Sequence, residues 1–202
     1  MPFLYLIGGP NGSGKSTLSA DLLQQYNLTA FDWDKEFYSI WKNFNYDISI
    51  LDGVRSSTSN QFLEYLQNGY RTSADLAFET NLNSREIFKH VDKAKSHGYI
   101  IILLFLLVDK LEICIERVAK RVNEGGHSVI DEEIIERYWK GLEILENEFH
   151  QFDQVYIYNA SENFKITGLT KNKERIYELI DLLKNNQLDK FKTDFSLEGY
   201  NY

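Results

Sequence analysis

The feature that most constrains the fold is a glycine-rich segment directly after a short apolar run. Residues 9–17 read Gly-Pro-Asn-Gly-Ser-Gly-Lys-Ser-Thr and contain the pattern G-x-x-x-x-G-K-[ST], and the apolar residues 3–7 before them suit a buried strand. Glycines let the backbone curl until successive N–H groups point inward at a phosphate, with the next helix N-terminus behind them. The order strand, loop and helix predicts a phosphate-binding loop and disfavours a turn that is merely rich in glycine.

Each residue of this loop has an expected part in binding a nucleoside triphosphate, ATP or GTP, together with Mg²⁺. Lys15 adds a mobile positive charge to the β- and γ-phosphates, and the Ser16 hydroxyl supplies one oxygen ligand to Mg²⁺. The nucleotide-binding residues predicted from the loop are Gly9, Pro10, Asn11, Gly12, Ser13, Gly14, Lys15, Ser16 and Thr17.

Length and composition favour one domain. The chain has 202 residues, of which 43% are hydrophobic, and no stretch resembles a linker. We therefore expect a single domain over residues 1–186. Residues 187–202 mix Lys, Asp, Asn and aromatic residues without a clear period, so we expect a C-terminal tail there.

Charge and cysteine content narrow the function classes. The formal net charge of −8 and a pI near 5.1 disfavour nonspecific binding to nucleic acid, which needs a basic stripe. Cys114 is the single cysteine, so no internal disulfide forms, which fits a reducing compartment. The longest apolar run, residues 99–108, is too short to cross a bilayer, and the N-terminus shows no signal peptide. We expect a cytoplasmic protein that does not bind membranes.

Strand-like and helix-like segments alternate along the chain, which predicts an α/β fold with a mostly parallel five-stranded sheet flanked by helices. The predicted strands are 3–8, 28–33, 75–80, 99–108 and 154–158, and the fourth is apolar enough for the centre of the sheet. The predicted helices are one that begins at Lys15 and others near 55–69, 83–97, 109–123, 131–149 and 173–186. Leu18, Leu22 and Tyr26 share one face of the first helix.

Polar side chains follow several predicted strands, where ligands of open α/β sheets bind. The second strand ends in Asp32-Trp33-Asp34. A kinase needs a carboxylate near the acceptor hydroxyl, and Asp34 is our preferred base, with Asp32 as the second choice. The alternative for Asp34 is a helix cap, because aspartate accepts backbone N–H bonds at the start of a helix.

Two further carboxylates follow strands. Glu79 and Thr80 end the third strand, where Glu79 could bind an acceptor or hold a water on Mg²⁺. The alternative is that Glu79 organises loops, with Thr80 and Asn81 as caps. Asp109 follows the fourth strand as a Walker-B aspartate would, but we favour a capping role for it at a helix that starts at Lys110.

A second motif lies in residues 116–127. Arg117 and Arg121 stand four apart, so both project from one flank of a helix, and a glycine pair ends that helix before His127. Residues 117–137 could therefore form a lid over the triphosphate, with Arg117, Arg121 and His127 on its phosphates. The alternative is that the arginines pair with nearby glutamates on a solvated face. Arg137 is a third candidate cation.

Together the loop 9–17, Phe78-Glu79-Thr80-Asn81-Leu82 and the segment from Arg117 to His127, followed by Arg137-Tyr138, resemble the zeta-toxin family of P-loop kinases. The chain is most similar to its short branch, whose members are often labelled predicted ABC-type ATPases. The resemblance runs from about residue 1 to 159. It implies a P-loop NTPase fold like that of nucleotide kinases, with a helical lid.

The resemblance also implies a reaction, which is transfer of the γ-phosphoryl group of ATP or GTP to a hydroxyl of UDP-N-acetylglucosamine. It assigns Lys15 and Ser16 to phosphate and Mg²⁺, Asp34 to the base, Glu79 to the acceptor pocket and Arg121 to the transition state. His127 stands near where longer relatives place a second lid arginine. Asp32-Trp33-Asp34 replaces the Asn-Ala-Asp that short relatives often have, which favours a different acceptor.

The sequence thus predicts a Mg²⁺-dependent kinase for a nucleotide sugar or a related nucleotide or metabolite. Two alternatives stay open: a P-loop ATPase or nucleotide switch without an acceptor, and a kinase of polynucleotide ends, which the acidic charge disfavours. If the relationship to toxins extends to function, an antitoxin protein partner is expected.

Overall fold

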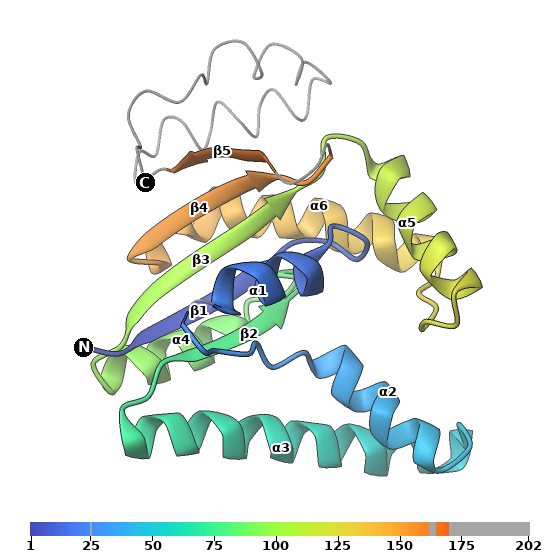
Figure 1. The fold of residues 1–202 in the computed structure, drawn as a ribbon, viewed down its shortest axis with the longest axis horizontal. Helices are drawn as coiled ribbons and strands as arrows, with labels where there is room; N and C mark the ends of the chain where they lie inside the picture. The colour runs from blue at the N-terminus through green and yellow to red at the C-terminus, as the bar shows by residue number, and fades with distance from the viewer. Residues whose placement is uncertain (25, 162–164, 170–202) are drawn as a thin grey trace.

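The computed structural model describes residues 1–24, 26–161 and 165–169. They form one five-stranded sheet in the order β2-β1-β3-β4-β5, in which the first four strands are parallel and β5 runs antiparallel to β4 (Figure 1). The strands are β1 (Phe3–Gly8), β2 (Leu76–Thr80), β3 (Ile100–Leu107), β4 (Gln154–Asn159) and β5 (Lys165–Leu169).

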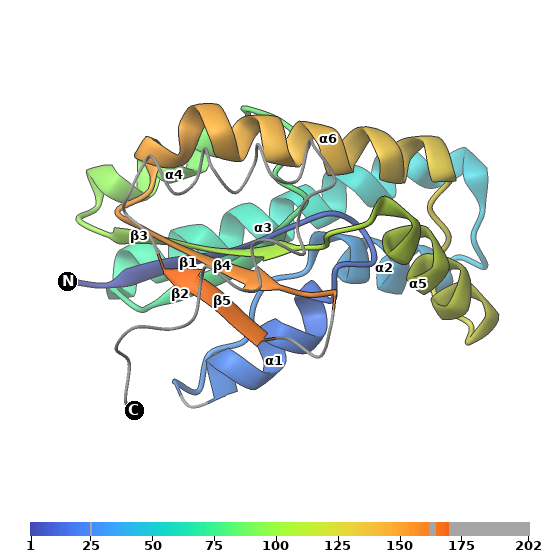
Figure 2. The ribbon, with the colours of Figure 1, turned by 90° about the horizontal axis from the view of Figure 1, so that it is seen from above.

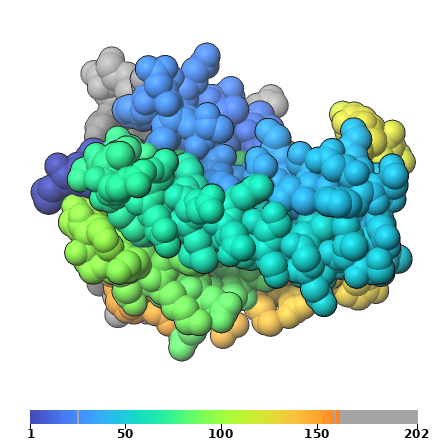
Figure 3. All heavy atoms as spheres, turned by 90° about the horizontal axis from the view of Figure 1, so that it is seen from below, coloured from blue at the N-terminus to red at the C-terminus, as the bar shows by residue number. Residues whose placement is uncertain are grey.

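Helices cover both faces of the sheet. They are α1 (Lys15–Gln24), α2 (Trp33–Asn43), α3 (Leu51–Thr72), α4 (Ile87–Ser96), α5 (Leu111–Asn123) and α6 (Asp131–Glu148), with short 3-10 turns at Ile48–Ile50 and Phe149–Gln151. Helix α1 lies on one face, and α4 and α6 lie on the other (Figure 2). Helix α3 runs along the outside of the molecule, with α2 beside it (Figure 3). Among the described residues, no helix combines the length and the apolar composition needed to cross a bilayer.

Strand β3 forms the centre of the core. It lies between β1 and β4, and its residues from Ile101 to Leu107 are all at most 6% exposed. Parallel sheets covered by helices on both faces bury their central strands in this way. The predicted central position of this strand is therefore confirmed, and so is the mostly parallel five-stranded sheet.

The prediction of a strand at 28–33 is wrong, because in that range only Phe31 pairs with the sheet. Its N–H donates to the carbonyl oxygen of Ala77, and its carbonyl oxygen accepts from the N–H of Glu79. Helix α2 begins at Trp33, so the chain turns away from the sheet after one bridged residue. The fifth strand is instead β5, which the sequence analysis did not predict. The predicted helix 173–186 and the tail lie outside the described residues.

Two local predictions also need correction. Tyr26 is 56% exposed and does not continue the buried face of Leu18, because α1 ends at Gln24. Asp109 does not cap α5, whose N-cap is Lys110 without a side-chain cap bond. One carboxylate oxygen of Asp109 is instead buried and has no hydrogen-bond partner in the described part of the chain.

Candidate functional site

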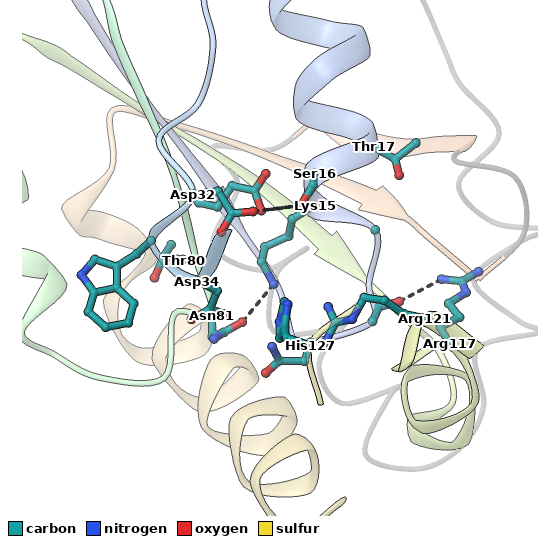
Figure 4. Close-up of a pocket in the computed structure, with 15 residues that line it drawn as sticks. Lys15, Ser16, Thr17, Asp32, Asp34, Thr80, Asn81, Arg117, Arg121 and His127 are labelled. Carbon is teal, nitrogen blue, oxygen red and sulfur yellow. Dashed lines mark hydrogen bonds between the residues drawn. The ribbon is translucent and has the colours of Figure 1, made fainter. Parts of the chain in front are cut away.

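A cavity of about 590 Å³ opens at the carboxyl ends of β1 and β2, where the P-loop, α2 and the end of α5 meet (Figure 4). This is the edge of an open α/β sheet at which ligands bind. The residues that line it are Asn11, Gly12, Gly14, Lys15, Ser16, Thr17, Asp32, Trp33, Asp34, Glu79, Thr80, Asn81, Arg117, Arg121 and His127. Of the sequence-predicted site residues, Gly9, Pro10 and Ser13 belong to the loop but do not line the cavity.

The backbone of the P-loop needs glycine at three positions. Gly9, Gly12 and Gly14 have φ angles of 145°, 80° and 92°, which L side chains rarely adopt. Gly12 also packs closely on α5, where an added Cβ would overlap the carbonyl oxygen of Cys114. The loop therefore curls around the start of α1 and rests on α5.

The ammonium group of Lys15 folds back over the loop. It donates to the carbonyl oxygens of Gly9 at 2.8 Å and Pro10 at 3.0 Å, and to Oδ1 of Asn81 at 2.9 Å. Burial lowers the pKa of Lys15, and the nearby carboxylates of Glu79 and Asp34 oppose that shift. The site thus holds a desolvated cation at the position where the motif predicts contact with phosphate.

Two carboxylates converge on the hydroxyl of Ser16. Its Oγ donates to Oε2 of Glu79 at 3.0 Å and lies 3.3 Å from Oδ2 of Asp32, while Ser19 donates to Oε1 of Glu79 at 2.9 Å. Burial and the charge of Asp32 raise the pKa of Glu79. One hydroxyl and two carboxylates are hard oxygen donors of the kind that Mg²⁺ takes beside phosphates, so these residues fit that ion.

The structure separates the roles of the two aspartates after Phe31. Asp32 is the N-cap of α2, and its Oδ1 accepts from the N–H of Lys35 at 3.0 Å. Asp34 lies in the first turn of the helix and lines the cavity. The helix cap that was the alternative for Asp34 is therefore supplied by Asp32.

Arg121 and His127 bring unpaired nitrogens to the cavity. Nε and one terminal nitrogen of Arg121, together with Nε2 of His127, are buried without a hydrogen-bond partner among the described residues. Burial lowers the pKa of His127 further below neutral, with help from the charge of Arg121. His127 is therefore a neutral imidazole at pH 7, and it stacks on Tyr38 of α2 at 4.5 Å between ring centroids.

Arg117 and Arg121 have different surroundings, although they stand one turn apart (Figure 4). Arg117 lies 3.5 Å from the carbonyl oxygen of Gly12 and 3.3 Å from that of Ser161, beyond the end of β4. Burial lowers the pKa of Arg121, and the nearby Asp34 and Tyr38 oppose that shift. The two guanidinium groups thus have different surroundings, although both residues line the cavity.

Sequence reasoning did not foresee the contacts of Asn81 and Trp33, and it named Arg137 only as a third candidate cation. Asn81, which was considered only as a cap, is an acceptor for Lys15, whereas the Oγ of Thr80 accepts from the N–H of Leu82 at 3.0 Å and holds the turn. Trp33 lines the cavity between the two aspartates. Arg137 donates at 2.9 Å to Oδ1 of Asn11, which is 3% exposed. Asn81 could have been found from its position as a polar residue just after a strand. No sequence pattern indicates that Arg137 contacts the P-loop.

The model of one protein family, AAA_33, described as an AAA domain, matches residues 4–145. The chain belongs to the AAA_33 family. The matched range contains every residue that lines the cavity. An uncharacterized protein of Haemophilus influenzae is 25% identical to this AAA_33 chain over 133 residues, which are 64% of this chain and 88% of the relative.

Solved structures place the AAA_33 chain in the P-loop kinase-like fold. It is similar to a chain of the PezAT chromosomal toxin-antitoxin system of Streptococcus pneumoniae, with a TM-score of 0.61 and 15% identity over 94% of this chain and 87% of that one. It is also similar to a chain of the AvrRxo1-ORF1:-ORF2 structure with ATP, with a TM-score of 0.63 and 17% identity over 99% of this chain and 66% of that one. The resemblance to zeta-toxin-like P-loop kinases is thereby confirmed at the level of the fold.

Proposed function

We propose that this AAA_33 protein is a Mg²⁺-dependent kinase that transfers the γ-phosphoryl group of ATP or GTP to the hydroxyl of a small molecule. The observation that carries the proposal is a single cavity lined by Lys15 and Arg121 as cations and by Asp34 as a carboxylate that is not used as the helix cap. UDP-N-acetylglucosamine or a related nucleotide or metabolite is the acceptor class that the resemblance to zeta toxins suggests.

The cations account for charge stabilisation. In phosphoryl transfer, negative charge spreads over the oxygens of the moving group, and the protein contributes mainly positioning and electrostatics. Lys15 already lies over the P-loop, and Arg121 brings buried donors that lack partners among the described residues. A preorganised donor in a water-poor site stabilises developing charge more than it would in water. We assign Lys15 and Arg121 to the transferring phosphoryl group.

Ser16, with Asp32 and Glu79 beside it, would hold Mg²⁺. The ion, when bound, neutralises charge on the β- and γ-phosphate oxygens. The hydrogen bonds from the Ser16 hydroxyl to both carboxylates support this assignment, because they bring three hard oxygen donors together at one side of the cavity. His127 and Arg117 complete the nucleotide site in this proposal. Arg117 would lie on the nucleoside side of the loop, since it reaches past Gly12 to Ser161.

Asp34 is the proposed base. It would orient the acceptor hydroxyl and accept its proton as the phosphoryl group leaves ATP. Thr80 and Glu79 would contact the acceptor beside it, because both residues line the same cavity on the side of β2. Residues 117–137 would close over the nucleotide as a lid, and the stacking of His127 on Tyr38 supports that closure onto α2.

An ATPase or switch without an acceptor is less well supported. That function needs a side chain that positions water, and Glu79 was the candidate. Both carboxylate oxygens of Glu79 accept hydrogen bonds from Ser16 and Ser19, which favours a role of Glu79 beside the proposed Mg²⁺ ligands over the positioning of an attacking water. A kinase of polynucleotide ends is disfavoured by the net charge of −8.

The proposal includes an antitoxin-like protein partner and action in the cytoplasm. The similar PezAT chain comes from a toxin-antitoxin system, which supports a partner here by analogy. Retention of a partner by the tagged wild-type protein from its own cells, identified by mass spectrometry, tests this part separately.

The central test is phosphoryl transfer from labelled ATP to a metabolite extract and to UDP-N-acetylglucosamine, read by mass spectrometry. Asp34→Asn should lower transfer by at least about 10²-fold while leaving the ATP dissociation constant within about twofold. Asp21→Asn, at an exposed position of α1, is the matched control and should keep full activity. Absence of transfer to every extract component by the wild-type protein would overturn the kinase proposal.

A further inference from the structure

A second cavity of about 200 Å³ adjoins the first one. It shares Trp33, Glu79 and Thr80 with the phosphoryl-transfer cavity, so the two lie side by side at the end of β2. The nucleotide and Mg²⁺ residues assigned above, apart from Glu79, do not line it. A molecule that places its hydroxyl beside Asp34 would therefore extend its remaining atoms into this second cavity.

The floor of the second cavity is aromatic. Phe62, on α3, packs on Phe78 with ring centroids 5.1 Å apart and on Phe31 at 5.2 Å, and the His90 imidazole lies edge to face on Phe62 at 5.1 Å. Trp33 supplies the wall between the cavities and is itself held by stacking on Phe37 at 5.2 Å. Aromatic side chains whose positions are fixed by packing form a suitable binding surface for the flat ring of a ligand in the second cavity.

The charges of the two cavities differ. The first contains Lys15, Arg117 and Arg121, whereas no lysine or arginine is among the described residues that line the second. Two glutamates, Glu79 and Glu86, line it instead. Burial lowers the pKa of His90, so this histidine adds no positive charge at pH 7. Glu86 is exposed and pairs with Lys89 at 3.1 Å. The described lining of the second cavity therefore offers a phosphate or carboxylate no cationic partner, whereas a neutral group needs none.

Polar side chains that line the second cavity can form hydrogen bonds with the edge of a bound ring. Asn83 and Ser84 line the second cavity together with the neutral imidazole of His90, so amide, hydroxyl and ring N–H groups surround the aromatic floor. The volume is also suited to one ring system, since a cavity of about 150 Å³ accommodates benzene. Flat shape, neutral charge and polar edges are the properties of a heteroaromatic base.

From these observations we infer that the acceptor is a neutral alcohol carrying a heteroaromatic ring, of the nucleoside class, with its ring in the second cavity against Trp33 and its hydroxyl beside Asp34. This inference rests on the proposed kinase function for the hydroxyl, but the ring site stands on its own contacts. It narrows the acceptor class given under the proposed function from nucleotide sugars to neutral alcohols, because the described lining of the second cavity has no cation for a diphosphate.

Binding can be measured without catalysis. The chain has three tryptophans, so the double variant Trp41→Phe, Trp139→Phe leaves Trp33 as its single indole. With the first cavity saturated by Mg²⁺ and a non-hydrolysable ATP analogue, uridine, adenosine and pyridoxine are titrated while Trp33 fluorescence is followed. At least one should quench it, and UMP and UDP-N-acetylglucosamine should bind at least about tenfold more weakly. Quenching by none of the three, or equal binding of UMP, would overturn the inference.

Transfer kinetics provide the second measurement. Loss of stacking on an aromatic side chain should cost roughly tenfold or more, so Trp33→Ala should lower kcat/KM for the bound nucleoside by that factor with an unchanged affinity for ATP. Trp33→Phe keeps a ring and should recover most of the loss, while Trp139→Ala, at a 45% exposed position of α6, should have no effect.

The outcomes separate the two proposals. Quenching of Trp33 without transfer to any alcohol keeps the ring site and refutes the kinase function. Transfer to ribose or N-acetylglucosamine as efficiently as to a nucleoside, with no effect of Trp33→Ala, keeps the kinase function and refutes the ring site.

Discussion

The ammonium nitrogen of Lys15 lies 2.9 Å from Oδ1 of Asn81, which ties the P-loop to the turn after β2. The two residues are 66 positions apart in the sequence. Their contact joins the side of the cavity proposed for the nucleotide to the side proposed for the acceptor, since Asn81 follows Glu79 and Thr80 directly.

Asn81→Leu is expected to weaken Mg²⁺-ATP binding about tenfold. We expect Asn81 to keep its hydrogen bond to the part-buried ammonium group in the ATP complex, where loss of a hydrogen bond to a charged group costs about 1.5–3 kcal/mol. Isothermal titration calorimetry measures the effect. Asn83→Leu, two residues on in the same loop, should leave ATP affinity unchanged, and an equal loss in both variants would contradict the role of Asn81.

Glu79→Gln is expected to stabilise the ligand-free protein at pH 7 and to lower Mg²⁺-dependent activity at least about tenfold. The pKa of Glu79 is raised by burial and by Asp32, so its ionised form costs stability in the folded state. Below the unfolded pKa both states are protonated and the cost is absent; as pH rises through the raised folded pKa the cost is reached in full. Thermal unfolding of both proteins should therefore give a higher Tm for the variant at pH 7 and equal Tm values near pH 4. Equal Tm values at both pH values would refute this account.

Gly126→Ala is expected to reduce kcat, by about tenfold, with little change in fold stability. An added Cβ would lie 2.5 Å from Cγ of Arg121, so the arginine stem must move and its guanidinium group with it. Gly125→Ala is the matched control, since its Cβ would meet open space but its φ of 86° is strained for alanine. That variant should lose about 1 kcal/mol of stability and keep its kcat. Steady-state kinetics and thermal unfolding distinguish the two, and a normal kcat for Gly126→Ala would show that Arg121 does not depend on this contact.

Arg137→Leu is expected to weaken ATP binding about tenfold. The substitution removes the hydrogen-bond donor to Oδ1 of the buried Asn11, and a buried amide without a partner costs about 1–3 kcal/mol. We expect the P-loop to move in order to avoid this cost, which disturbs the phosphate site. Lys140→Leu breaks an exposed ion pair with Glu136 on the same helix and should change affinity by less than about twofold. If calorimetry gave the same affinity for Arg137→Leu as for the wild type, the contact would not order the loop.

Local sequence patterns were sufficient for the P-loop and the central strands. The glycines at 9, 12 and 14 permit positive φ angles that other residues rarely adopt. The uninterrupted apolar run of β3 is typical of a central strand that is covered on both faces of the sheet. These features depend on residues close together in the chain. The cavity position followed from them, because the carboxyl ends of parallel strands meet at one edge.

Helix α2 and the strand error at 28–33 show what local patterns could not give. Leu28, Ala30 and Phe31 have the composition of a strand, but the Asp32 side chain caps a helix that starts one residue later. Long-range pairing decided the outcome, since only Phe31 reaches the edge of β2. The contacts of Arg117 have the same origin. Helical spacing predicts a flank shared with Arg121, but the partners of Arg117 are Gly12 and Ser161, which are distant in the sequence.

The packing of Gly12 on the backbone of Cys114 limits how the nucleotide can be enclosed. Because the P-loop leans on the first half of α5, that half cannot swing outward without loosening the phosphate cradle. In the proposed kinase, the freedom to admit and release nucleotide would therefore be left to the last turn of α5 and the two glycines that follow it. A short hinge at that point would move Arg121 and His127 while the cradle keeps its shape.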